Sequence, residues 1–178
     1  YDDLAGLVEL PERTETPEDM ETGTAPIETE PAGSAPSVVL PMVDFESLRE
    51  SGPDIIGWLT LPDTVINYPV TQADDNEYYL HHLYDGTYNK TGCLFADYEN
   101  QEDFSDRNTI IYGHNMNDGS MFGSLKKYKD DGFWKVNQYF TVYSETTAYR
   151  YRIFSYEDAV NGGDVYKVGY QPGEEYQK

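Results

Sequence analysis

From residue 43 onward, short β-prone runs follow one another closely, and turn residues separate them. This spacing leaves no room for long helices, so it constrains the fold more than any other feature. The expected strands are residues 55–61, 65–70, 91–97, 109–112, 139–144 and 149–155, and short helices are expected at 44–50, 74–82 and 121–128. Such a succession predicts a mostly β fold with short helices, an antiparallel barrel or sandwich. The 17 tyrosines agree with it, because aromatic side chains suit a half-buried sheet.

Residues 1–42 differ in composition from the rest of the chain. They are acidic, rich in Pro, Thr and Glu, and poor in aromatic side chains. Because such a segment buries too little apolar surface to offset the entropy lost on ordering, we interpret it as a tether. A short helix at residues 2–10 is the alternative for its first part. The folded domain is expected to occupy residues 43–178.

Charge and metal-ligand spacing limit the class of partner. The chain has 12 Lys and Arg against 33 Asp and Glu, a net charge of −21, which repels phosphate backbones and disfavours binding to nucleic acids. His81 and His82 are neighbours on an expected helix, so their side chains point about 100° apart and cannot easily share one metal ion. We therefore expect both on the helix surface, with no metal site and no cofactor.

His114 is the residue whose position best suits chemistry. It follows the expected strand at 109–112 directly, with Gly113 between them and a polar loop after it. A histidine where a strand meets a loop can be held rigidly and still be reached by substrate, which suits acid–base work. A structural histidine at a strand end is the other interpretation, and residue types alone leave both open.

Cys93 is the only cysteine, so the chain has no intrachain disulfide. It lies inside the expected strand at 91–97, where a small buried thiol is the usual occupant. Nothing in the neighbouring sequence makes its surroundings electropositive, so no cause for a lowered thiol pKa is visible.

Several stretches, in one consistent order, resemble the class B sortases. Residues 53–59 and 66–70 resemble the opening strands of that family, and residues 75–80 resemble the helix that follows them. Residues 92–98 are similar to its G-S-x-F-x-D strand, with Cys93 in a position usually held by a small residue. Residues 108–115, with His114, resemble the stretch around its catalytic histidine, and residues 116–123 and 153–155 continue the similarity.

The resemblance implies a sortase β-barrel with cysteine transpeptidase activity. In this family a thiolate cleaves a C-terminal sorting signal after threonine, and an amine of a peptidoglycan precursor releases the product, which anchors the surface protein to the cell wall. By resemblance, His114 is the catalytic histidine, and Asn76, Leu80 and Asn115 are candidates for peptide contact. The resemblance also implies the extracellular face of a Gram-positive plasma membrane, with anchoring by an N-terminal helix outside these residues.

Two parts of the family's site do not occur in these 178 residues. The nucleophilic cysteine lies in a T-L-S-T-C strand that corresponds to positions after Lys178, and the arginine follows it; no arginine of this chain matches that motif. We therefore expect the chain to be inactive alone. The alternative is a catalytically dead, sortase-like module that binds peptides. A barrel without its last strands has an unpaired edge, which predicts dimerisation or strand exchange.

Overall fold

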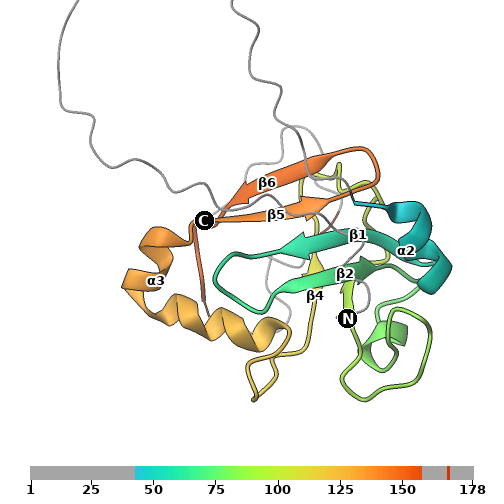
Figure 1. The fold of residues 1–178 in the computed structure, drawn as a ribbon, viewed down its shortest axis with the longest axis horizontal. Helices are drawn as coiled ribbons and strands as arrows, with labels where there is room; N and C mark the ends of the chain where they lie inside the picture. The colour runs from blue at the N-terminus through green and yellow to red at the C-terminus, as the bar shows by residue number, and fades with distance from the viewer. Residues whose placement is uncertain (1–42, 158–167, 169–178) are drawn as a thin grey trace, which may run out of the picture.

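The structure is a computed structural model, and it describes residues 43–157 and residue 168. The predicted tether at residues 1–42 and the alternative helix at 2–10 lie outside the described residues. Six strands form one sheet in the order β4-β3-β2-β1-β5-β6 (Figure 1). The strands are β1 Ile55–Thr60, β2 Asn67–Thr71, β3 Leu94–Ala96, β4 Ile111–Tyr112, β5 Tyr139–Tyr143 and β6 Ala148–Arg152.

Antiparallel pairing dominates the sheet, and β2 and β3 form the one parallel pair among the described strands. The sheet is curled into half of a barrel, with β4 and β6 at its edges. The prediction of a mostly β fold with short helices is confirmed. Strand β2 contains Pro69 although it lies between β1 and β3 in the sheet. Proline fits there because pairing with β3 begins one residue later, at Val70.

Strand β1 is buried on both faces, so neighbouring residues of one strand enter different cores. Trp58 packs on one face with Phe45 and Leu48 of helix α2 (Phe45–Ser51), while Leu59 packs on the other face with Val142 and Val70. Figure 1 shows α2 at one end of the sheet and helix α3 (Asp131–Val136) at the other. This double burial explains why β1 reads as an apolar run without alternation.

The helices are shorter or tighter than their sequence pattern predicted. Helix α2 begins as expected, with the side chain of Asp44 accepting from the backbone N–H of Ser47. The expected helix at 74–82 is wrong: only the 3-10 turn η1 (Tyr78–Leu80) forms. The expected helix at 121–128 is a 3-10 helix, η2 (Phe122–Lys129), whose apolar residues recur every three positions, the period of that helix. Helix α3 had not been predicted.

Candidate active site

His114 lies two residues beyond the end of β4, and its imidazole is half-buried. Its Nε2 atom lies 3.1 Å from the backbone oxygen of Leu80. A carbonyl oxygen only accepts hydrogen bonds, so Nε2 must carry the proton of this bond. Nδ1 has no hydrogen-bond partner among the described residues, and in the neutral ring it holds a free lone pair. The geometry therefore fixes which ring nitrogen can exchange a proton with another molecule.

Close packing at Gly113 sets where the His114 backbone lies. A Cβ atom at Gly113 would collide with the side chains of Leu94 and Phe122, so only glycine lets β4 approach them. The loop after His114 folds back, because the N–H of Phe122 donates to the oxygen of His114 at 3.2 Å and Asn115 pairs with Met121. Asn115 itself is exposed beside His114. The histidine is therefore positioned by packing before it and by backbone pairing after it.

The turn that presents the Leu80 oxygen begins with hydrogen bonds between a side chain and the backbone. The carboxylate of Asp75 accepts from the N–H groups of Glu77 and Tyr78, each at 2.8 Å. Such bonds compete with helical ones, which explains why the expected helix shrinks to η1. The chain then reverses, and His82 pairs with Tyr88. As a result, the oxygen of Leu80 faces His114 rather than continuing a helix.

Asn76 is bonded within the protein at both ends of its amide. Its nitrogen donates to Asp97 at 2.9 Å, and its oxygen accepts from the N–H of Tyr98 at 3.1 Å. Asp97 also accepts from the hydroxyl of Tyr112 at 2.8 Å. Asp97 is the final residue of the G-S-x-F-x-D similarity, but the sequence analysis assigned a role neither to it nor to Tyr112. A signal for Tyr112 was present, since it ends the expected strand and lies two residues before His114.

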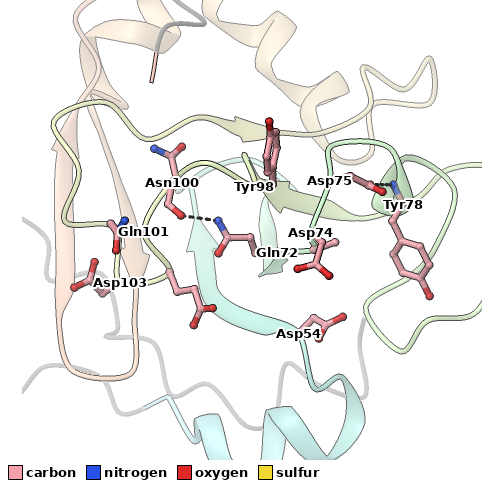
Figure 2. Close-up of a pocket in the computed structure, with 11 residues that line it drawn as sticks. Asp54, Gln72, Asp74, Asp75, Tyr78, Tyr98, Asn100, Gln101 and Asp103 are labelled. Carbon is pink, nitrogen blue, oxygen red and sulfur yellow. Dashed lines mark hydrogen bonds between the residues drawn. The ribbon is translucent and has the colours of Figure 1, made fainter. Parts of the chain in front are cut away.

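Two cavities flank this region, and His114 lines neither of them. The first, of about 820 Å³, is acidic (Figure 2). Several of its polar groups are already bonded: Asp75 accepts from the N–H of Tyr78, Gln72 donates to the oxygen of Asn100, and Asp54 accepts from the hydroxyl of Tyr79. These groups have structural partners, so the acidity of this cavity by itself defines no site.

The second cavity, of about 990 Å³, is an apolar groove on the inner face of the sheet. Ile111 of β4 and Phe122 of η2 line it, and both are close to His114 in the chain. On the far side it reaches β6 and Phe154, whose side chain is 92% exposed. The hydroxyl of Thr109, also in its wall, is buried without a hydrogen-bond partner among the described residues. An apolar groove of this size can accommodate an extended peptide segment.

Cys93 lies in the core, as predicted, with no exposed surface. Burial raises the pKa of its thiol to about 12, against a smaller lowering effect of the hydrogen bond with Thr71. Such a thiol contains almost no thiolate at neutral pH. Cys93 therefore lacks the ionisation that a nucleophile paired with His114 needs.

The other histidines differ in their contacts. His81 is exposed, as expected. His82 is half-buried instead: its ring stacks on Tyr78 with centroids 4.0 Å apart, and its Nδ1 lies 2.7 Å from the oxygen of Tyr78. Among the described residues, no group of three or more His, Cys, Asp or Glu side chains is arranged to hold a metal ion. No helix within residues 43–157 has the length and apolar character needed to cross a membrane.

Comparison with known proteins gives a consistent result. The family model of the sortase domain matches residues 59–176. Sortase B of Listeria monocytogenes is 46% identical over 112 residues, which are 63% of this chain and 46% of that protein. Sortase B of Staphylococcus aureus is 29% identical over 134 residues, 75% of this chain and 55% of that protein. The chain thus spans about half the length of the curated relatives it matches.

Solved structures agree with this fold. The crystal structure of sortase B from Bacillus anthracis in complex with AAEK1 superposes with a TM-score of 0.61 at 43% identity, covering 64% of this chain and 54% of that one. A Staphylococcus aureus sortase B–substrate complex superposes with a TM-score of 0.60 at 33% identity, covering 62% of this chain and 51% of that one.

Proposed function

Because the chain belongs to the sortase family, with class B members as its relatives, we propose that it supplies the histidine-bearing part of a sortase B cysteine transpeptidase. One observation supports this proposal most directly. The imidazole of His114 is bonded through Nε2 to the Leu80 oxygen, which leaves Nδ1 available for proton transfer. The reaction cleaves a sorting signal after threonine and joins the surface protein to a peptidoglycan amine.

His114 acts in this proposal as the proton carrier. A thiolate attacks the carbonyl carbon of the threonine, the C–N bond breaks, and the leaving amine takes a proton from Nδ1 of the imidazolium. The incoming amine then attacks the thioester, gives a proton back to Nδ1, and releases the thiolate as the new amide forms. The bond from Nε2 to Leu80 persists in both protonation states, so the ring need not reorient between the steps.

The thiolate must come from outside the 178 residues, since Cys93 is buried with a raised pKa. The same holds for the arginine that steadies the oxyanion in the family. The chain alone is therefore inactive in this proposal. A catalytically dead peptide-binding module is the second candidate, and the apolar groove near the His114 loop supports it, because binding a peptide there needs no thiol.

The apolar groove supports a peptide partner. It begins beside the His114 loop at Phe122 and Ile111, and Leu80 and the exposed Asn115 flank the imidazole. In this proposal a sorting peptide extends beyond the end of the groove to the imidazole, where its threonine carbonyl approaches Nδ1 and Leu80 and Asn115 are contacts. The Staphylococcus aureus structure noted above is a sortase B–substrate complex, which supports a substrate-binding role for this chain.

Two further parts of the proposal concern the setting of the enzyme. We place it at the outer face of a Gram-positive plasma membrane, where its peptidoglycan substrate is found.

Over the described residues β6 is an edge strand, and Phe154 beyond it is 92% exposed. An unpaired edge beside an exposed aromatic ring favours self-association of the 178-residue chain. Light scattering at rising concentration tests this, and a constant monomer mass contradicts it.

The test of the proposed activity uses a version of the protein extended through the cysteine and arginine segments. His114→Ala should reduce cleavage of a fluorogenic sorting-signal peptide by at least about a thousandfold, because members of such a unit act together. His81→Ala is the matched control, since it removes an exposed imidazole and should retain activity. Equal activity of the His114→Ala and His81→Ala variants would refute the assignment.

A further inference from the structure

We propose that Asp97 is a positioning residue for His114, because its carboxylate holds together the two chain segments that orient the imidazole. The inference rests on the proposed proton-carrying role of His114. It deepens that role by assigning residues that do not touch the reacting atoms.

One oxygen of Asp97 joins the two segments. Oδ2 accepts from Asn76 Nδ2 at 2.9 Å and from the Tyr112 hydroxyl at 2.8 Å. Asn76 precedes Leu80 by four residues, and Tyr112 precedes His114 by two. The Leu80 oxygen in turn binds Nε2 of His114 at 3.1 Å. The three hydrogen bonds and the two chain segments, residues 76–80 and 112–114, together form a closed loop. Asp97 lies at one side of this loop and the imidazole of His114 at the other.

The surroundings of Asp97 suit a fixed carboxylate. The residue is 4% exposed and directly follows β3, so the rigid sheet sets its position. Its other oxygen, Oδ1, accepts from the N–H of Glu99 at 3.0 Å. Its backbone oxygen accepts from Gln72 at 2.7 Å. Both oxygens of the Asp97 carboxylate therefore accept hydrogen bonds. An asparagine at position 97 cannot replace the carboxylate, because an amide has only one acceptor oxygen.

Tyr112 carries this restraint to His114. Its ring packs against Phe95 of β3 with centroids 5.1 Å apart, and its hydroxyl reaches Asp97. Only Gly113 separates it from His114, so a shift of Tyr112 moves the imidazole relative to the Leu80 oxygen. Misplacement of a catalytic group by about 1 Å can reduce turnover about a hundredfold.

The same geometry reassigns Asn76. Both polar ends of its amide are bonded within the protein, to Asp97 and to the N–H of Tyr98. A peptide ligand would have to break one of these bonds to use the amide. Asn76 therefore orients the turn that presents Leu80, and it contributes little to peptide affinity.

The test compares three variants that each remove one tyrosine hydroxyl. Tyr112→Phe removes the bond to Asp97 and keeps the ring. Tyr98→Phe removes an exposed hydroxyl next to Asp97 that is not bonded to it. Tyr143→Phe removes the hydroxyl of a buried side chain on β5, from which three strands separate β4, and so controls for a general loss of stability.

The first readout is the imidazole ¹⁵N spectrum of the 178-residue chain at about pH 8.5, where an ordinary imidazole is neutral. His114→Ala identifies the His114 signals. We expect the Nε2–H tautomer to dominate in the parent chain, and its ratio to the Nδ1–H tautomer to fall several-fold in Tyr112→Phe and Asp97→Asn only. An unchanged ratio in Tyr112→Phe overturns the proposal, even if Asp97→Asn does not fold.

The second readout is peptide cleavage by the extended protein. Tyr112→Phe and Asn76→Ala should lower kcat by about tenfold or more with KM unchanged. In the double variant kcat should fall by less than the product of the two single reductions, because both residues act through Oδ2 of Asp97. A raised KM with kcat unchanged overturns the positioning role and makes them peptide contacts. Absence of cleavage by the extended parent protein refutes the proposed function alone, because the tautomer ratio still tests Asp97.

Discussion

Labelling of Cys93 by a thiol reagent at about pH 8 should be roughly a thousandfold slower in the folded chain than in the unfolded one. Burial raises the pKa of this thiol from 9.0 to about 12. At pH 8 about one thiol in ten is then ionised in the unfolded chain, and about one in ten thousand in the folded chain. The side chain has no exposed surface, so the reagent also needs a local opening of the core, which slows the reaction further.

The assay follows the release of thionitrobenzoate from Ellman's reagent, with the native chain and with the chain in concentrated guanidinium chloride. Cys93→Ser, which removes the only thiol, should give no signal in either condition. A native rate within tenfold of the unfolded rate would refute the reasoning. If His114→Ala also slowed that fast reaction, Cys93 and His114 would form a reactive pair, and the assignment of Cys93 to the core would be wrong.

Four further predictions concern stability and organisation. The free energy of unfolding should fall by roughly 1 kcal/mol between about pH 8 and pH 10, because the Cys93 thiol ionises at a lower pH in the unfolded chain than in the folded one. Chemical denaturation of Cys93→Ser should not show this fall. Gly113→Ala should destabilise the chain by about 1–3 kcal/mol through its collision with Leu94, and a thermal midpoint equal to that of the parent would contradict this. Leu48→Ala should cost about 2–5 kcal/mol, since its side chain is fully buried under α2; a cost below about 1 kcal/mol in urea denaturation would count against that packing. Light proteolysis should remove residues 1–42 and leave a core that starts near Val43, as mass spectrometry can show; equal resistance of both parts would contradict the tether.

The strands could be predicted along the sequence because apolar runs and turn residues report burial directly, whereas their order in the sheet and the parallel pair of β2 and β3 were not predicted. Strand β1 and the hairpin of β5 and β6 appear close to their expected bounds. The helix at residues 74–82 could not be predicted correctly from periodicity. The carboxylate of Asp75 bonds to backbone N–H groups at the start of the turn, and apolar spacing does not report such competition.

The sequence predicted which residues belong to the candidate site, but it did not predict how their atoms contact one another. The sequence marked His114 by its place after a strand, and the resemblance marked Leu80 and Asn76. That the Leu80 backbone oxygen, rather than its side chain, faces the imidazole depends on how η1 turns, and no sequence pattern encodes this. Asp97 belongs to the strand motif of the resemblance, but its role was missed because a carboxylate after a strand usually marks a solvated turn. Here the side chain is buried and accepts three hydrogen bonds.

The central claim is that His114 serves a cysteine transpeptidase whose thiol is not Cys93. The most direct test measures cleavage of a fluorogenic sorting-signal peptide, with and without an added amine, by the 178-residue chain and by the version extended through the cysteine and arginine segments. The account predicts no cleavage by the shorter chain and amine-dependent product from the extended one, lost in its His114→Ala variant. Cleavage by the 178-residue chain that disappears in Cys93→Ser would contradict the account and make Cys93 the nucleophile.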